Sequence, residues 1–233
     1  MQRFADSCTP TLAAVLGVCG GVASGKSSAC AFLASHDSRA LHVNADALAH
    51  AAYAPGGPAY ARVAALFPSA VRASDATIDR AALGRIIFGD ARARSDLEAA
   101  VWPAVAALAL EDLSSRAAAR AARGEPPAVG VIEAALLLEA GWAQACDGVW
   151  LIRVPRDVAV TRVQARANAP STDVATTIVD AQATAEVRLA AAEAAGVTVD
   201  SVIDSNQPVD GTRAQIAAAW GAFLKKRGLG NPP

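Results

Sequence analysis

The stretch Gly20-Gly21-Val22-Ala23-Ser24-Gly25-Lys26-Ser27 matches the pattern G-x-x-x-x-G-K-[ST] of phosphate-binding loops. The apolar run from Leu12 to Val18 comes directly before it and reads as a strand, and the segment from Ser28 to Ala34 is compatible with a helix. In such a loop the glycines let backbone N–H groups converge on phosphate oxygens, and the following helix adds its positive N-terminal end. Strand, loop and helix in this order indicate a phosphate site rather than a glycine turn that binds nothing.

Two residues of this loop carry the predicted chemistry. Lys26 is expected to reach the β- and γ-phosphates of a nucleotide, and the Ser27 hydroxyl is expected to bind Mg²⁺. Lysine occurs elsewhere only in the tail pair Lys225-Lys226, so Lys26 is not one of many interchangeable surface cations. The predicted nucleotide-binding residues of the loop are Gly20, Gly21, Val22, Ala23, Ser24, Gly25, Lys26, Ser27 and Ser28.

Composition narrows the class of protein. The 233 residues suit one α/β domain with a small insertion, and the 21 basic residues nearly balance the 22 acidic ones. The chain therefore lacks the basic excess of nucleic-acid binders, and no segment approaches the ~18 uninterrupted apolar residues of a membrane span. The four cysteines show neither a C-x-x-C pair nor metal-ligand spacing. We expect a cytoplasmic protein with no nucleic-acid or membrane partner; the sequence does not determine the oligomeric state, and a monomer is favoured.

The two ends of the chain are expected to lie outside the folded domain. Residues 1–11 read as a polar extension, and they are not taken as part of a signal peptide because the apolar run that follows leads into the phosphate loop. Residues 228–233 read as a flexible tail. A single domain containing the phosphate loop is then predicted over 12–227.

Five short apolar runs alternate with longer helical patterns along the chain. This alternation is typical of a parallel sheet covered by helices on both faces. We predict an α/β fold of the P-loop NTPase class, with a five-stranded parallel sheet flanked by helices. The expected strands are Ala13 to Cys19, Ala40 to Asn44, Ala128 to Glu133, Gly148 to Val154 and Val199 to Asp204.

The connection between the second and third expected strands is long. It runs from about 47 to 124, is helical by its apolar spacing, and is interrupted at Pro55-Gly56-Gly57-Pro58, Pro68 and Gly89. So much helix within one connection predicts an inserted helical subdomain. The turn back to the sheet is expected at Arg123-Gly124-Glu125-Pro126-Pro127.

Two acidic residues stand at the ends of expected strands, where the ligands of an open parallel sheet gather. Asp46 follows the second strand, and its position suits either a catalytic carboxylate or the N-cap of the next helix. Glu133 ends the third strand, and it suits either a Mg²⁺ ligand or an ordinary capping acid. Position alone leaves both pairs of alternatives open.

Arginines mark the region after the fourth expected strand. Pro155 is expected to be the first residue of a helix that carries Arg156, Arg162 and Arg166. Since Arg162 and Arg166 are four residues apart, they are expected to share one face of this helix.

A second helix is expected from Asp173 to Ala195, after a break at Asn168, Pro170 and Ser171, and it contains Arg188. Two helices edged with arginine suit a lid over phosphates, at about 162–190, because guanidinium groups bind charge that is spread over several oxygens. The alternative is that these arginines are ordinary solvated surface residues.

The order of these segments resembles the motif order of dephospho-CoA kinases. The resemblance runs from about Leu12 to Phe223 and is most specific around Asp46 and between Gln182 and Asn206. The segments that carry it are Gly17 to Ser28, Val43 to His50, Leu136-Leu137-Leu138-Glu139, Arg162 to Arg166, Ala181-Gln182-Ala183-Thr184 and Val202-Ile203-Asp204-Ser205-Asn206.

The resemblance implies an adenylate-kinase-like P-loop kinase that uses ATP and Mg²⁺ to phosphorylate the ribose 3′-hydroxyl of dephospho-CoA, the last step of coenzyme A synthesis. It implies that Asp46, Lys26 and Arg166 are catalytic. It also implies that the helical subdomain receives the acceptor and that Asn206 lies near the adenine of ATP. The residues implied in acceptor binding are Asp46, Arg80, Leu136, Leu137, Arg162 and Arg188, and the metal would be held by Ser27 and Glu133.

The chain departs from the family pattern at Asn44, Trp102 and Ala135, where Asp, His and Pro are usual. Two other activities remain open: another small-molecule kinase, for nucleosides or nucleoside monophosphates, or an ATP-binding relative that has lost catalysis. A GTPase is disfavoured because the chain has neither Asp-x-x-Gly nor Asn-Lys-x-Asp.

Overall fold

The computed structural model describes residues 12–166 and 170–230. Two compact units divide the chain: residues up to Val43 together with those from Leu113 onward, and Asn44–Asp112. The predicted extension, 1–11, and Asn168 of the predicted helix break lie outside the described residues. Among the helices of the described ranges, none is long and apolar enough to span a membrane.

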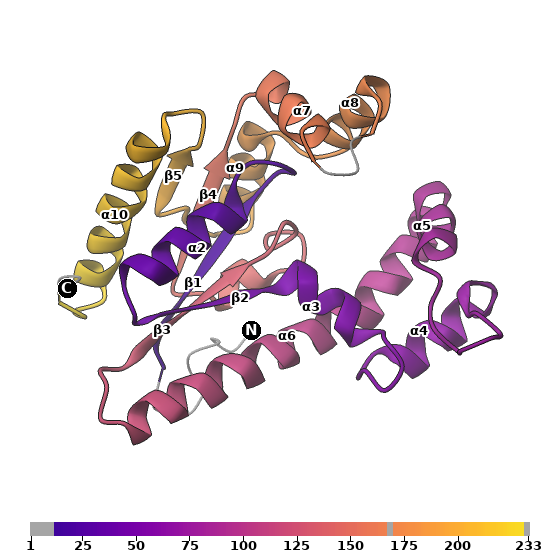
Figure 1. Cartoon of the computed structure of the whole chain (residues 1–233), viewed down its shortest axis with the longest axis horizontal. Coiled ribbons are helices and arrows are strands. Elements are labelled where there is room, and N and C mark those ends of the chain that lie inside the picture. The colour runs from indigo at the N-terminus through magenta and orange to yellow at the C-terminus, as the bar shows by residue number, and fades with distance from the viewer. Residues whose placement is uncertain (1–11, 167–169, 231–233) are drawn as a thin grey trace. The chain divides into compact units, whose positions relative to one another are not determined.

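The first unit is built on a five-stranded parallel sheet with the strand order β2-β3-β1-β4-β5 (Figure 1). The predicted α/β architecture is therefore confirmed. The last strand begins two residues later than predicted, because the Asp200 carboxylate accepts a hydrogen bond from Val149 N at 3.0 Å and replaces the regular ladder there. The strands are β1 (Leu12–Gly20), β2 (Ala40–Asn44), β3 (Ala128–Glu133), β4 (Gly148–Arg153) and β5 (Ser201–Asp204).

Strands β1, β3 and β4 are buried almost throughout, which explains why they read as continuous apolar runs. Helices α2 (Lys26–His36) and α10 (Val209–Lys226) pack against the sheet and against each other (Figure 1). Trp220 of α10 meets Trp150 of β4 edge to face, with ring centroids 6.4 Å apart. The helix that begins at the phosphate loop is thus held by the main core.

A buried carboxylate fixes the far end of α2. Asp37, the C-cap residue, is fully buried, pairs with Arg39 at 2.8 Å and accepts a hydrogen bond from Trp220 Nε1 at 2.8 Å. Burial alone would raise the pKa of Asp37, but the hydrogen bonds from Arg39 and Trp220 more than offset it and hold the pKa at about 2. Asp37 is therefore an ionised anchor between α2 and α10.

The second unit is helical, as predicted for the long connection. The predicted interruptions fall between its elements or at their ends. The Pro55 to Pro58 segment follows α3, Pro68 is the first residue of η1, and Gly89 is the last residue of α5. The last helix continues to Ala122, but its residues from Leu113 belong to the first unit. The elements are α3 (Ala45–Ala52), α4 (Tyr60–Leu66), the 3-10 turn η1 (Pro68–Ala70), α5 (Arg80–Gly89) and α6 (Ala91–Ala122).

The region between β4 and β5 differs from the prediction. It holds α7 (Arg156–Gln164), α8 (Thr172–Asp180) and α9 (Ala185–Ala194), so the single helix expected from Asp173 to Ala195 is wrong. The helix breaks after Asp180 because Thr184 starts a new one, its Oγ1 accepting a hydrogen bond from Val187 N at 3.3 Å.

The helix that follows β4 also has different ends from those expected. Pro155 is the N-cap of α7 rather than its first residue, and the helix ends at Gln164. Arg166 therefore lies beyond the helix, and the expectation that Arg162 and Arg166 share one helical face is wrong.

Candidate active site

The phosphate loop joins β1 to α2, as its sequence predicts. Gly20 has a φ of 152°, and a Cβ there would collide with the Ile152 carbonyl of the neighbouring strand. Gly25, the N-cap of α2, has a φ of 90°, and Ala23 has a φ of 55° although it is not a glycine. These left-handed conformations curl the backbone between the strand and the N-terminus of the helix. Ser28 is exposed in the first turn of α2.

The lysine of the loop bends back over it. Lys26 Nζ donates hydrogen bonds to the carbonyl oxygens of Gly20 and Gly21, each at 2.9 Å, and the side chain is buried. Within the described residues, the hydroxyl oxygen of Ser24 is also buried and has no hydrogen-bond partner. A positive charge and an unused hydroxyl oxygen are therefore concentrated at the loop that is expected to bind phosphates.

A hydroxyl and a carboxylate meet next to the loop. Ser27 Oγ donates a hydrogen bond to Glu133 Oε1 at 2.6 Å, and His42 Nε2 lies 2.9 Å from Glu133 Oε2. Burial alone would raise the pKa of Glu133, but the hydrogen bonds from His42 and Ser27 more than offset it, so the pKa is lowered. Since an ionised carboxylate only accepts, His42 carries its proton on Nε2. Ser27 and Glu133 form an oxygen pair of the kind that binds Mg²⁺.

Arg162 ties the loop to the end of the sheet. Its Nη1 donates to Ser205 Oγ at 2.9 Å and to the Ala23 carbonyl at 3.2 Å, and its Nη2 donates to the Ser205 carbonyl at 2.7 Å. Asn206 follows Ser205 and is exposed, with its backbone N–H bonded to Asp204 Oδ1 at 2.9 Å. Arg162 and Asn206 thus belong to one corner of the first unit, beside the loop.

Two of the predicted lid arginines, Arg166 and Arg188, have opposite surroundings. Arg166 is exposed, and no hydrogen bond or ion pair of its guanidinium is found within 12–166 and 170–230. Arg188 is only 3% exposed and donates from Nη1 to the Ala135 carbonyl at 2.9 Å and to Glu139 Oε1 at 3.1 Å. Arg188 therefore fixes α9 to the loop after β3, whereas Arg166 has its charge in solvent.

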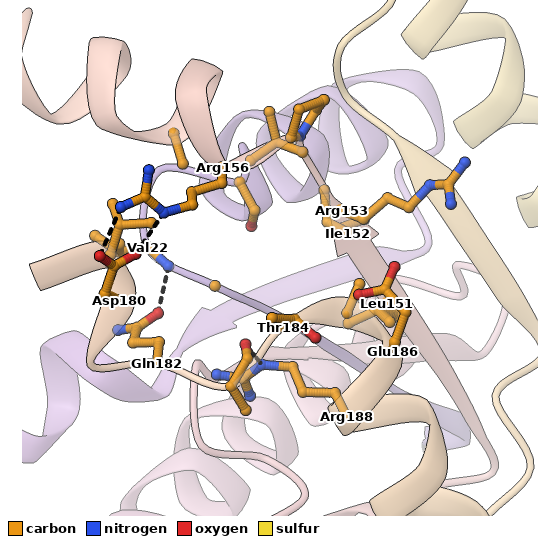
Figure 2. A pocket seen from close by; sticks show the side chains of 18 of the residues that line it. Val22, Leu151, Ile152, Arg153, Arg156, Asp180, Gln182, Thr184, Glu186 and Arg188 are labelled. Carbon is orange, nitrogen blue, oxygen red and sulfur yellow. Dashed lines mark hydrogen bonds and ion pairs between the residues drawn. The ribbon is translucent and has the colours of Figure 1, made fainter. Parts of the chain in front are cut away.

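Gln182 was not predicted as a site residue, yet its side chain reaches the phosphate loop. Val22 N donates a hydrogen bond to Gln182 Oε1 at 2.6 Å (Figure 2). The contact depends on the break between α8 and α9, which turns this side chain toward the loop. The sequence carried one usable signal, Thr184, because a threonine followed by an acidic residue in the next turn is typical of a helix start.

A cavity of about 510 Å³ lies beside this contact (Figure 2). The phosphate loop, the end of β4 and the start of α9 line it, with Leu151 and Ile152 among the apolar residues. Two arginines of its lining are already paired: Arg153 with Asp204 at 3.6 Å, and Arg156 with Asp180 through two contacts of 2.6 Å. Its arginines are therefore partly neutralised.

The two predicted leucines after β3 have opposite environments. Leu136 is 40% exposed, but Leu137 is fully buried, and a Cβ on Gly17 would come within 2.6 Å of its Cδ2. Leu137 is a core residue behind β1, so only Leu136 presents a surface to a ligand.

In the second unit, Asp46 lies in the first turn of α3 and is exposed. The N-cap of this helix is Asn44, whose Oδ1 accepts a hydrogen bond from Ala47 N at 2.9 Å. Of the two alternatives that position left open for Asp46, the N-cap of this helix is therefore excluded. Asn44, where the family usually has Asp, can serve as this N-cap because Asn caps a helix about as well as Asp does.

Arg80, also in the second unit, lies at the start of α5 and contacts α3. Its Nη2 lies 2.5 Å from His50 Nε2, and His50 Nδ1 lies 2.8 Å from the Tyr53 hydroxyl. Burial, and next the charge of Arg80, lower the pKa of His50. His50 is therefore held neutral between Arg80 and Tyr53, and it accepts on Nε2 and donates from Nδ1.

Comparison with known proteins gives a consistent result. The family model for dephospho-CoA kinase matches residues 14–204. A dephospho-CoA kinase of Moorella thermoacetica is 36% identical over 210 residues, which cover 88% of this chain and 90% of that protein. The crystal structure of TT1252 from Thermus thermophilus superimposes with a TM-score of 0.70 at 29% identity, over 91% of this chain and 97% of that one.

A dephospho-CoA kinase structure from Campylobacter jejuni supports the fold alone. It superimposes with a TM-score of 0.58 at 20% identity, covering 91% of this chain and 98% of that one. The match of the family model and the identity to the Moorella protein both extend over most of the chain. With the phosphate loop and the Ser27–Glu133 pair in place, they show that the chain belongs to the dephospho-CoA kinase family.

Proposed function

We propose that this protein transfers the γ-phosphoryl group of ATP to the ribose 3′-hydroxyl of dephospho-CoA, giving coenzyme A and ADP. The observation that carries the proposal is the pairing of Ser27 with Glu133 at 2.6 Å beside a complete phosphate loop, in a chain that belongs to this family. A phosphate loop with an adjoining hydroxyl–carboxylate pair suits a nucleotide bound together with a divalent cation.

Mg²⁺ is part of the proposal, and the residues present fit it. Ser27 and Glu133 offer the hard oxygen ligands that Mg²⁺ prefers, and His42 holds the second oxygen of Glu133 in place. The chemistry that bound Mg²⁺ supplies is neutralisation of phosphate charge.

The first unit supplies the groups that bind and polarise ATP. Lys26, now bonded to the loop carbonyls, would exchange these for phosphate oxygens, while the loop N–H groups hold the phosphate chain. The exposed guanidinium of Arg166 is proposed to stabilise charge on the transferring group. Arg162, bonded to Ser205 and Ala23, is proposed to shape the ATP site next to Asn206.

Asp46 is proposed to accept the proton of the acceptor hydroxyl. In this step the 3′-oxygen forms a bond to the γ-phosphorus, the bond from that phosphorus to the ADP oxygen breaks, and the proton moves to the Asp46 carboxylate. The role of Asn44 as N-cap of α3 supports this, because the cap position is filled by Asn44 and not by Asp46.

The second unit, with Arg80, is proposed to bind the acceptor, together with the exposed Leu136. Arg188 and Leu137, which are buried, are proposed to act on the acceptor only by positioning other groups. The proposal includes a monomeric, cytoplasmic enzyme with no nucleic-acid or membrane partner.

An ADP-release assay tests the function. The purified chain is given ATP and Mg²⁺ with dephospho-CoA, AMP, adenosine or pantetheine compounds, and the product is identified by mass. We expect turnover with dephospho-CoA and a product heavier by one phosphate. Turnover with AMP or adenosine instead would assign another small-molecule kinase, and ATP binding without transfer to any acceptor would indicate lost catalysis.

A further inference from the structure

Three side chains with metal-binding atoms meet beneath the phosphate loop. They are Cys30 of α2, His42 of β2 and Glu133 at the end of β3, and one ligand atom of each lies within 4.8 Å of the other two. The spacing of these three residues in the sequence does not match a metal-binding motif, because neighbouring strands and one helix bring them together only in the fold. It uses Glu133, but Cys30 has no part in the proposed phosphoryl transfer.

The fold explains why these atoms converge. Cys30 is three residues after Ser27 on α2, so it lies on the same helix face, one turn further from the loop. β2 and β3 are neighbours in the sheet, which places His42 beside Glu133, with Nε2 and Oε2 2.9 Å apart. Cys30 and Glu133 are 1% and 2% exposed, while the His42 side chain is 22% exposed. Two members of the cluster are thus buried, and His42 is partly exposed to solvent.

The donor set selects a class of cation. Thiolate sulfur, imidazole nitrogen and carboxylate oxygen are the usual ligands of Zn²⁺, whereas Mg²⁺ prefers oxygen alone. Zinc bonds of about 2.0–2.3 Å in a tetrahedron require ligand atoms about 3.5 Å apart. The ligand atoms now lie within 4.8 Å of one another, so side-chain rotations that move each atom by about 1 Å bring them to this separation. A water molecule is expected as the fourth ligand, as in zinc sites with three protein ligands.

We propose that Cys30, His42 and Glu133 form a binding site for Zn²⁺ or a similar thiophilic divalent cation, and that its occupation inhibits the enzyme. On binding, the Cys30 thiol releases its proton to solvent and its sulfur bonds to the metal. His42 gives up its Nε2 proton to solvent and takes one up on Nδ1, so that Nε2 is free to bind, while Glu133 Oε2 exchanges the His42 hydrogen bond for the metal. The Glu133 carboxylate is then drawn from Ser27, its partner at the Mg²⁺ site. The inhibition rests on the proposed function, whereas the binding does not.

Cobalt(II) is the probe for the site, because it takes zinc positions and its thiolate complexes absorb visible and near-ultraviolet light. Nucleotide-free protein is titrated with Co²⁺ alone. We expect a thiolate-to-cobalt charge-transfer band that saturates at one equivalent and disappears when Zn²⁺ is added. Absence of this band overturns the site, whatever the enzymatic activity of the preparation.

Matched variants identify the thiol. Cys30→Ser should abolish the band, while Cys146→Ser should keep it, because Cys146 is a free, half-buried thiol outside the cluster whose Sγ donates to the Trp142 carbonyl. Cys30→Ala provides a second variant if serine unfolds the core. A band that survives both changes at Cys30 in folded protein, or that Cys146→Ser removes, contradicts the assignment.

Inhibition is measured separately on the complete enzyme. Zn²⁺ at a fixed excess of Mg²⁺ and ATP should suppress turnover, a chelator should restore it, and Cys30→Ser should need at least ~10-fold more Zn²⁺, since losing one of three ligands costs at least this much affinity. Equal zinc sensitivity of wild type and Cys30→Ser overturns the inhibitory role. If the wild type shows the cobalt band but has no kinase activity with any acceptor, the proposed function fails and the metal site stands.

Discussion

The phosphate loop and the segment from Pro155 to Ala194 both carry residues predicted to handle phosphate, but they are held in different ways. The loop works through its backbone, and its curl is fixed by Gly20, Gly25 and the contacts of Lys26. The residues predicted for the lid segment, in contrast, are long side chains, and the direction of each depends on where a helix ends. A site formed by backbone groups can therefore be predicted from a short sequence motif. A site formed by long side chains can be predicted only when the helix boundaries are also predicted correctly.

The largest expected effect tests the loop itself. Lys26→Ala should lower kcat by about 10³-fold, the upper range for loss of one preorganised charge, because the other two lysines, Lys225 and Lys226, belong to the last turn of α10 and not to the loop. The melting temperature should change little, and kcat is measured by ADP release. Lys225→Ala, in the exposed last turn of α10, is the control and should keep full activity. Near-normal turnover of folded Lys26→Ala protein would remove the loop from the mechanism.

The lid is tested by exchanging one cation for another. Arg166→Lys should lower kcat by up to about 10³-fold, because lysine keeps the charge but loses the planar fork. Arg162→Lys should instead raise the KM for ATP more than it lowers kcat, since Arg162 holds Ala23 and Ser205 in place. The reverse result, a silent Arg166→Lys and a kcat defect in Arg162→Lys, would show that Arg162 is the residue that acts on the transferring group.

Asp46→Asn tests the acceptor side of the reaction. Since Asn44 is the cap of α3, this change keeps the cap and should shift the melting temperature little, yet lower phosphate transfer at least ~100-fold by removing the proton acceptor. Asp90→Asn is the matched control, because Asp90 accepts from Arg92 N and Ala93 N and Asn can do the same. Unchanged kcat in Asp46→Asn would mean that another group takes the proton.

A pH experiment compares the buried Asp37, at the end of the helix that follows the loop, with the exposed Arg156–Asp180 ion pair of the lid segment. The pKa of Asp37 falls from 3.8 to about 2 on folding, so its ionised form stabilises the fold above pH 3.8, and this stabilisation, about 2 kcal/mol, is lost as pH falls toward 2. Wild type should lose unfolding free energy over this range faster than Asp37→Asn does. Asp180→Asn, in the exposed pair with Arg156, should follow wild type. Identical acid sensitivity of wild type and Asp37→Asn would contradict the buried-anchor role.

The smallest effect concerns the hydrogen bond between Val22 of the loop and Gln182 of the lid segment. Gln182→Ala removes the acceptor of the Val22 N–H, so the exchange of this amide with solvent should accelerate by up to about 10-fold. Hydrogen exchange followed by NMR measures it. Gln164→Ala, which removes an exposed contact with Thr172, should leave Val22 unchanged. Slower or unaltered exchange at Val22 in Gln182→Ala would show that the hydrogen bond does not protect it.

The sheet was predictable from the sequence because buried parallel strands leave continuous apolar runs. The starts of β2, β3 and β4 coincide with the predicted ones, and the phosphate loop lies where its motif indicates. Glu133 was placed correctly at the end of β3, but position alone did not show that its carboxylate bonds Ser27.

The features that the sequence did not reveal are of two kinds. Some depend on competition between helix propensity and helix capping, and others on contacts between residues far apart in the sequence. The α7 end and the α8–α9 break were missed because alanine-rich sequence is helical by propensity throughout, and one capping threonine outweighs it. The burial of Arg188 and Leu137 was missed because it depends on contacts with the loop after β3 and with Gly17. The cap role of Asn44 was readable in principle, since Asn at a strand end before a helix is a strong N-cap signal.

The clamp made by Arg162 has a consequence for the order of folding. The loop motif is complete at residue 27, but the carbonyl of Ala23 is held by a guanidinium from residue 162 that is itself fixed by Ser205. A chain emerging from the ribosome therefore makes the nucleotide-binding motif early and restrains it late, after β1 has paired with β3 and β4 and β5 has been synthesised. We expect nascent chains that end before Ser205 to bind ATP weakly, so that competence for phosphoryl transfer is acquired only with nearly complete synthesis.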